Sequence, residues 1–188
     1  MSQRGVTAAL TLLAILMLAG VIQIGWLLLV PRVAPDDAYA RLSAVAPEGG
    51  VRVLPRASSP GDPLPDRDPS VATAVCRYDL DQGPLRVSAG LGDQDFVALT
   101  LHGRSGVVFY GLTDRAGNDG KLDLVVMTPD QRDAAQARDS ADAPVRDVRV
   151  VAPERQGFVS FDVLPRLGGY AQAERDLGSM SCRVEHPV

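Results

Sequence analysis

Residues 6–30 read VTAALTLLAILMLAGVIQIGWLLLV; they carry no charge, and Gln23 is their one strongly polar side chain. A helix over these 25 residues would span roughly 37 Å at about 1.5 Å per residue. That length exceeds the ~30 Å hydrocarbon thickness of a bilayer. We therefore expect a transmembrane anchor over residues 6–30, and everything after it reads as a water-soluble, β-rich module.

A cleaved signal peptide is the alternative interpretation of this stretch. Secretory signals have an apolar region of roughly 7–15 residues, followed closely by a small-x-small cleavage site. Residues 38–40 (Ala-Tyr-Ala) offer such a site, but they lie behind Pro31, Pro35 and two aspartates. Because the apolar run is longer than a secretory signal needs, the sequence favours a retained signal anchor.

Basic residues flank the span on both sides, with Arg4 before it and Arg32 and Arg41 after it, so charge alone does not set its orientation. The five-residue leader and the long tail are typical of an uncleaved anchor. We therefore expect a single-pass protein with residues 1–5 in the cytoplasm and the domain on the other side of the membrane.

The chain has two cysteines, Cys76 and Cys182, each on the more apolar face of a short alternating segment. A disulfide between neighbouring strands would close a loop of 106 positions (182 − 76), for which chain entropy gives about 4.7 kcal/mol. Two free thiols that pack as small hydrophobic groups are the alternative. Because the anchor points to an oxidising compartment, the sequence favours the bond.

The segment between the anchor and the module divides in two. Asp36 or Asp37 is placed to cap a short juxtamembrane helix over residues 38–45. Residues 47–69 then hold six prolines and several glycines, which excludes a regular helix and predicts a semi-extended spacer with an optional edge strand at 51–54. We expect residues 31–69 to form this juxtamembrane helix and linker and residues 70–188 to form one domain.

Alternation and β-branched content predict eight strands in that domain: 76–80, 85–89, 96–102, 107–112, 122–127, 147–151, 158–164 and 182–186. The residues Thr128-Pro129-Asp130-Gln131 predict the start of a helix, and a second helix is expected over 169–177. The predicted fold is mainly β: an antiparallel two-sheet sandwich, jelly-roll-like, with two short helices, preceded by one transmembrane helix.

Past the anchor, eighteen basic side chains stand against twenty-three acidic ones, a net charge of about −5. This balance argues against nucleic acid as a partner, because phosphate backbones are bound by clustered Lys and Arg. Residues 103–107 (Gly-Arg-Ser-Gly-Val) resemble a nucleophile elbow, but Val107 replaces the required glycine, so a hairpin turn is the better interpretation.

The remaining polar groups also favour structural roles. The only histidines, His102 and His186, end two strands without the spacing of a zinc site. Acidic and glycine-rich loops fit turns or solvated tips better than calcium, acid-base or dinucleotide sites: Asp114, Asn118, Asp119 and Asp123; Asp93 and Asp95; and residues 90–92. We therefore predict no catalytic, cofactor-binding or metal-binding residue, no cofactor, and no enzyme activity.

The stretches 74–80 (AVCRYDL), 83–87 (GPLRV), 109–115 (FYGLTDR) and 126–131 (VMTPDQ) resemble an uncharacterised family of proteobacterial predicted integral membrane proteins that carry a domain of unknown function. The likeness covers the anchor and most of residues 69–184. It implies an inner-membrane protein with a periplasmic domain that acts beside another envelope protein. It supplies no activity, so no functional residue is carried over.

Three functions remain open from the sequence. The first is a non-enzymatic module in the bacterial inner membrane, a scaffold or partner of another envelope protein, with the lipid bilayer as its other partner. The second is a β domain that binds a small ligand or a cell-wall component in an apolar pocket between its sheets. The third is an enzyme, which would need His102, His186 and two aspartates to cluster.

Overall fold

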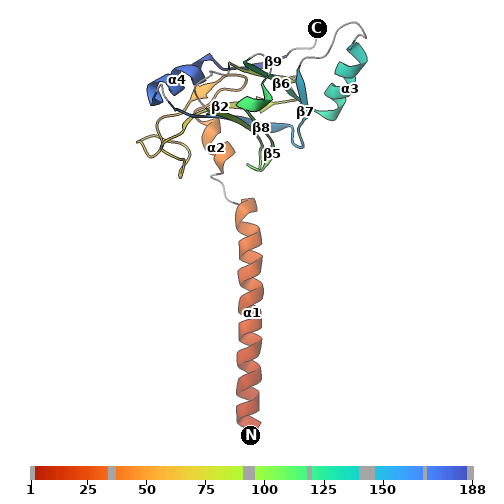
Figure 1. The fold of residues 1–188 in the computed structure, drawn as a ribbon. Coiled ribbons are helices and arrows are strands. Elements are labelled where there is room, and N and C mark those ends of the chain that lie inside the picture. The colour runs from red at the N-terminus through yellow and green to blue at the C-terminus, as the bar shows by residue number, and fades with distance from the viewer. Residues whose placement is uncertain are drawn as a thin grey trace. The chain divides into compact units, whose positions relative to one another are not determined.

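The computed structural model describes residues 3–33, 37–90, 96–117, 120–139, 147–166 and 169–185. The chain divides into two units, Met1–Asp36 and Asp37–Val188. The first unit is helix α1 (Gln3–Val33), and the second is a two-sheet β domain with short helices (Figure 1).

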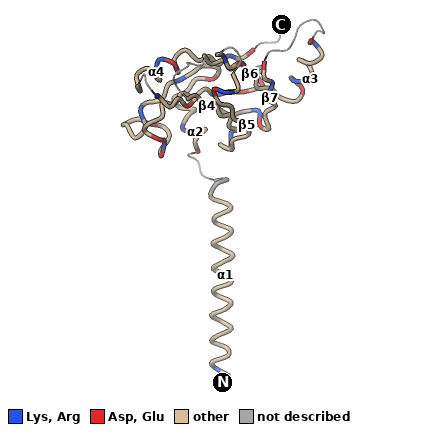
Figure 2. Tube along the Cα trace, viewed as in Figure 1, with Lys and Arg blue, Asp and Glu red and all other residues tan. Residues whose placement is uncertain are grey.

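Helix α1 is long and apolar enough over Gln3–Val30 to cross a membrane, and no part of that stretch is buried by other described residues. Figure 2 shows no charge along the body of this helix, whereas charged residues are frequent in the β domain. The predicted apolar helix is confirmed. A retained anchor and a signal sequence near the amino terminus both pass this test of length and composition.

One sheet has five strands, all antiparallel, in the spatial order β1-β2-β8-β4-β5. Its strands are β1 (Arg52–Val53), β2 (Ala72–Asp79), β8 (Gln156–Leu164), β4 (Phe96–Gly103) and β5 (Val108–Thr113). The optional edge strand expected at 51–54 is present as β1. The central strand is β8, which comes late in the sequence and pairs with both β2 and β4.

The second sheet has four strands in the order β7-β6-β3-β9. Its strands are β7 (Val148–Val151), β6 (Lys121–Met127), β3 (Leu85–Gly90) and β9 (Ser181–Val184). Strands β6 and β7 run parallel, so the prediction of a wholly antiparallel sandwich is wrong at this pair, and a jelly roll is built from antiparallel strands. The cause is helix α3 (Pro129–Arg138), which follows β6 and carries the chain back to start β7 in the same direction.

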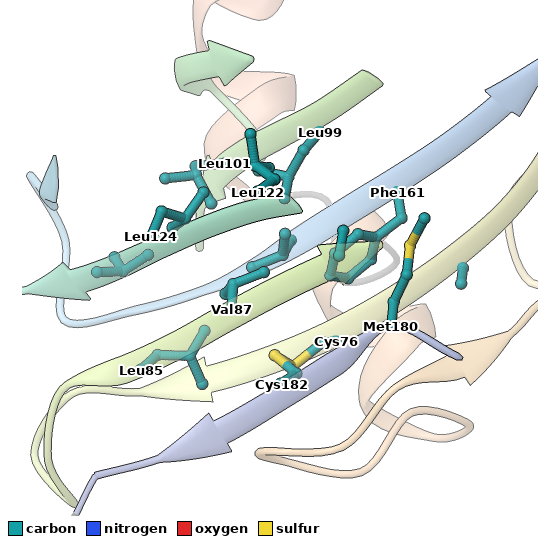
Figure 3. Close-up of a cluster of buried hydrophobic side chains, with 14 of the residues drawn as sticks. Cys76, Leu85, Val87, Leu99, Leu101, Leu122, Leu124, Phe161, Met180 and Cys182 are labelled. Atoms are coloured by element: carbon teal, nitrogen blue, oxygen red, sulfur yellow. A yellow bond between two sulfur atoms is a disulfide. The ribbon is translucent and has the colours of Figure 1, made fainter. Parts of the chain in front are cut away.

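The two sheets pack face to face, and alternate residues of each strand fill the space between them. Leu99, Leu101 and Phe161 of one sheet meet Val87 and Leu124 of the other, as Figure 3 shows. Helix α4 (Tyr170–Ser179) adds Ala173 and Leu177 to the same core. Helices α4 and α3 lie at opposite ends of the domain (Figure 1).

A disulfide joins Cys76 of β2 to Cys182 of β9, with 6.5 Å between their Cα atoms. The two strands are not hydrogen-bonded neighbours; they belong to different sheets, so the bond crosses the core (Figure 3). Both cysteines are buried, at 0% and 4% exposure. The covalent link therefore ties the two layers of the sandwich together from inside.

The segment predicted to be a spacer packs on the outer face of the five-stranded sheet instead. Helix α2 (Ala38–Ser43) begins at Asp37, whose Oδ1 accepts a hydrogen bond of 2.7 Å from the Ala40 amide. The buried side chains that cover this face come from both sides of the contact: Tyr39, Leu42, Ala46 and Leu54 from the segment, and Val75 and Phe158 from the sheet. The proline content excludes long helices but leaves these apolar side chains free to pack. The compact unit therefore begins at Asp37, and the predicted boundary at residue 70 falls inside it.

Helices α3 and α4 begin where the sequence predicts. Thr128 caps α3 by accepting a hydrogen bond from the Gln131 amide at 3.2 Å, and the Gln131 side chain accepts one from the Thr128 amide at 2.9 Å. This reciprocal pair is the capping box that the four residues from Thr128 to Gln131 predict. The hairpin tip expected at Asn118 and Asp119 lies outside the described residues.

Candidate binding groove

An open groove of about 340 Å³ lies on the outer face of the four-stranded sheet, beside α3. Val125 and Met127 of β6 form its apolar floor, and both are buried. Ala135 and Arg138 line it from α3. The remaining lining residues are Pro84, Arg86, Asp139, Asp147, Arg149 and Glu185. We refer to this hollow as the charged groove.

Arg149 on β7 is the more enclosed of the two arginines that the strands place in the charged groove. Its guanidinium donates two hydrogen bonds to the Asp139 carboxylate, at 2.6 and 2.7 Å. Its Nε lies 3.6 Å from an oxygen of Asp147 and is buried without a hydrogen bond. The hydrogen bonds from Arg149 lower the pKa of Asp139, and the same contacts raise the pKa of Arg149. Both groups are therefore charged at neutral pH.

Arg86 on β3 is shared among three acids. Its Nη1 lies 3.0 and 2.8 Å from the two oxygens of Asp123, and its Nε donates to Glu185. Its Nη2 lies 3.9 Å from Asp147, so Asp147 stands between Arg86 and Arg149. The hydrogen bond to Glu185 is the main cause that raises the pKa of Arg86.

This pairing limits what the charged groove can bind. Arg86 and Arg149 each hold at least one carboxylate, so a simple anion would have to displace an acid before it reached either of these two guanidinium groups. The third arginine of the groove, Arg138, donates from its Nε to the Ala134 carbonyl oxygen. The apolar floor with charges of both signs around it suits a segment that also carries both, such as a polypeptide. A smaller hollow of about 210 Å³ borders the groove and shares Pro84 and Arg138 with it.

His102, considered as a functional candidate from the sequence, is held by ring stacking and hydrogen bonds within the domain. Its ring stacks on Phe158 with 4.4 Å between ring centroids. Its Nδ1 is 3.1 Å from the Gly106 carbonyl oxygen, and its Nε2 is 2.9 Å from the Thr100 hydroxyl. Because a carbonyl oxygen only accepts, Nδ1 carries a proton. His186 lies outside the described residues, so the clustering that the enzyme hypothesis would require is not tested.

Ser105 lies in the turn between β4 and β5, as the hairpin interpretation predicts. Its hydroxyl donates to the Glu154 carboxylate at 2.7 Å, and its amide donates to the same group at 3.1 Å. Gly106 has a φ angle of +80°, a conformation that favours glycine. These contacts fix the turn to the loop before β8.

Two of the four residues considered as a calcium loop, Asp114 and Asp123, lie within the described part of the chain. Asp114 begins a short 3-10 helix, Asp114–Ala116, and Asp123 pairs with Arg86. Asn118, Asp119, Asp93 and Asp95 lie outside the described residues. Within the described ranges, no three His, Cys, Asp or Glu side chains gather as a metal site.

The sequence reasoning missed the charged groove. Arg86 and Asp123 occupy outward positions of strands that were predicted correctly. The alternation of polar and apolar residues in these strands already places both charges on the outer face of the sheet. Asp139 and Arg149 meet only because α3 returns the chain to the edge of the sheet. The signal that could have found the groove is the presence of arginines on outward positions of buried strands.

The sequence matches no described protein family and no curated protein. The fold matches the crystal structure of the VPA0106 protein from Vibrio parahaemolyticus with a TM-score of 0.55 and 10% sequence identity, over 81% of this chain and 38% of that one. An uncharacterized protein from Burkholderia cenocepacia aligns with a TM-score of 0.44 and 14% identity, over 71% of this chain and 34% of that one. The chain thus spans well under half of either protein. The Vibrio likeness shows a shared fold alone.

Proposed function

We propose that the chain is a single-pass protein of the bacterial inner membrane whose periplasmic β domain binds another envelope protein. The observation that carries this proposal is a disulfide buried between the two sheets of a domain that follows an apolar amino-terminal helix. Stable disulfides form in oxidising compartments and are rare in the cytosol. Helix and disulfide are independent features, and both favour the same side of the membrane.

A binding role fits the charged groove better than catalysis does. Within the described residues, the serine, histidine and acidic side chains considered as catalytic candidates are engaged in turns, ring stacking and ion pairs. The groove instead offers an apolar floor and fixed charges of both signs, which give specificity at protein interfaces. We propose the groove as the partner-binding surface.

The connection to the anchor narrows the kind of partner. The sequence between the end of α1 and Asp37 is residues 34–36, and an extended chain advances at most about 3.6 Å per residue. The residues predicted to form a long spacer, 47–69, belong instead to the compact unit that begins at Asp37. We propose that the partner is itself a membrane protein or one held at the membrane surface.

A second candidate function is the binding of a small ligand or cell-wall component. The charged groove, at about 340 Å³, is near the lower limit of the ~300–1,000 Å³ that ligand pockets occupy. Described side chains of both sheets pack together in the core, and the charged groove lies on the outer face of the four-stranded sheet. We therefore propose the charged groove as the binding surface for such a ligand.

Topology can be tested with reporters fused to the carboxyl end of the full chain. We expect a reporter that works only in the periplasm to be active, and one that works only in the cytoplasm to be silent. Alkaline carbonate extraction and the intact mass of the extracted chain would show whether α1 is retained. A chain that lacks α1, or a reporter active only in the cytoplasm, would refute the proposed placement.

The partner can be sought by affinity capture of the tagged full chain after mild detergent extraction and cross-linking. Arg149→Ala removes a groove side chain, and we expect it to lower recovery of a specific co-purifying protein. Arg132→Ala is a matched control, because Arg132 pairs with Asp133 on α3 and does not line the groove. Equal recovery from both variants would exclude the groove as the binding surface.

A further inference from the structure

Gln23 is distinct among the polar side chains of the apolar stretch in α1. The Thr7 and Thr11 hydroxyls donate to the carbonyl oxygens of Gln3 and Thr7, one turn back, at 3.0 and 2.9 Å. The Gln23 side-chain amide makes no hydrogen bond with any described residue. The threonines are thus satisfied within their own helix, and Gln23 is not.

An unpaired amide is costly inside a membrane. The midpoint of residues 6–30 is residue 18, so Gln23 lies five positions away, about 7.5 Å along the helix axis. That depth is within the ~30 Å hydrocarbon layer. No water is available there to replace the missing hydrogen bonds of the amide. A partner that supplies them is therefore favoured.

The helix face around Gln23 allows a second helix to approach closely. Ala19 and Gly20 lie four and three residues before Gln23, and Leu27 lies four residues after it, so all share one face. A Cβ added at Gly20 would meet nothing within 4 Å. Small residues at such positions let helix backbones pack closely in bilayers.

We propose that this face, comprising Ala19, Gly20, Gln23 and Leu27, binds the same face of a second copy of the chain within the membrane; the inference rests on the proposed anchoring by α1. An amide has both donors and acceptors, so two copies of Gln23 satisfy each other across a two-fold axis. An apolar partner helix cannot do so. The absence of charge over residues 6–30 leaves no repulsion between the copies.

The test is sedimentation equilibrium of the full chain in density-matched detergent micelles, supported by cross-linking in phospholipid bilayers. We expect the wild-type chain to dimerise. Gln23→Leu, which keeps the helix apolar, should raise the dissociation constant about fivefold to thirtyfold, or roughly 1–2 kcal/mol at 1.4 kcal/mol per tenfold change. Gln23→Asn retains an amide and should restore part of the affinity.

Two comparisons separate this face from general effects of mutating the helix: Thr11→Val with Gln23→Leu, and Gly25→Leu with Gly20→Leu. Thr11→Val removes a hydroxyl that is already satisfied, so it should leave the dissociation constant unchanged. Gly20→Leu widens the proposed contact face and should weaken the dimer. Gly25→Leu makes the same change on the opposite face, where an added Cβ also meets nothing within 4 Å, and should have no effect.

The outcomes distinguish this inference from the proposed anchoring. A chain found without α1 after carbonate extraction and mass analysis would overturn both. A chain that retains α1 but is monomeric, or whose dimer is equally strong with Gln23→Leu, would overturn the self-association alone. A monomer that cross-links through this face to a different membrane protein would assign the face to another span instead.

Discussion

Loss of the inter-sheet disulfide should weaken the β domain markedly while the fold stays recognisable. The bond closes a loop of 106 positions, for which chain entropy gives about 4.7 kcal/mol. Losses measured on removal of native disulfides are about 2–5 kcal/mol. With a urea dependence of about 2 kcal/mol per molar, the unfolding midpoint should fall by roughly 1–2.5 M urea.

The assay compares one sequence in two redox states. Because both cysteines are buried, the bond should be reduced in urea and the protein refolded with reductant present. The only tryptophan, Trp26, lies in α1, whereas the four tyrosines all lie in the β domain. The change in tyrosine near-ultraviolet circular dichroism on unfolding in urea therefore follows the β domain, and Trp26 adds a background that is common to both redox states.

A matched control isolates the bond from other effects of the reductant. The double variant Cys76→Ala with Cys182→Ala has no bond to lose, so its midpoint should be the same with and without reductant. Mass analysis after thiol labelling confirms which state each sample holds. If the wild-type midpoint stays unchanged while both thiols are free, the reasoning from loop closure is refuted.

Three further predictions test side chains of the β domain. Burial raises the pKa of Tyr78 above its ordinary value of 10.0, so the unfolded state loses this proton first and stability should fall as pH rises above about 10; Tyr78→Phe should reduce that slope in urea titrations at several pH values. Gly157→Ala would place a Cβ 2.1 Å from a backbone carbonyl oxygen of β4, so it should lower the free energy of unfolding by more than about 3 kcal/mol in the same titration. In the control Gly111→Ala the added Cβ has no atom nearer than 3.8 Å, so the free energy of unfolding should change by less than about 1 kcal/mol. Arg149→Ala should let the pKa of Asp139 rise toward 3.8, as followed by NMR of the carboxyl carbon. It should also remove the part of the acid-induced loss of stability that comes from protonating Asp139 below its unfolded pKa. If the pKa of Asp139 is the same in the variant, Arg149 is not the cause of its shift.

Local chemistry made the individual elements predictable. Alternation identified most strands, because successive side chains point into the core and away from it. The four residues from Thr128 to Gln131 identified the start of α3 through the reciprocal capping bonds. The pairing of Cys76 with Cys182 followed from cysteine count and compartment. Each of these predictions depends on residues close together in sequence or on simple counting.

What failed depends on contacts between distant segments. The parallel β6–β7 pair arises because α3 reverses the chain, and alternation within a strand says nothing of the direction of its neighbour. Tyr39 and Leu42 were assigned to a juxtamembrane helix, but the sequence did not show that Val75 and Phe158 face outward to receive them. Arg86 and Arg149 line the same groove because β3 and β7 both flank β6 in the sheet, and this strand order is not visible in the sequence.

Strand β9 gives the domain a late step in its assembly. It pairs with the edge of β3 and supplies the sulfur that closes the disulfide, and Cys182 lies 106 positions after Cys76. Because a ribosome makes the chain from its amino end, Cys76 is a free thiol and this edge of β3 is uncovered until the segment around Cys182 has been synthesised. A truncation before Cys182 would leave that edge exposed and the thiol unpaired, and we expect such a product to be degraded.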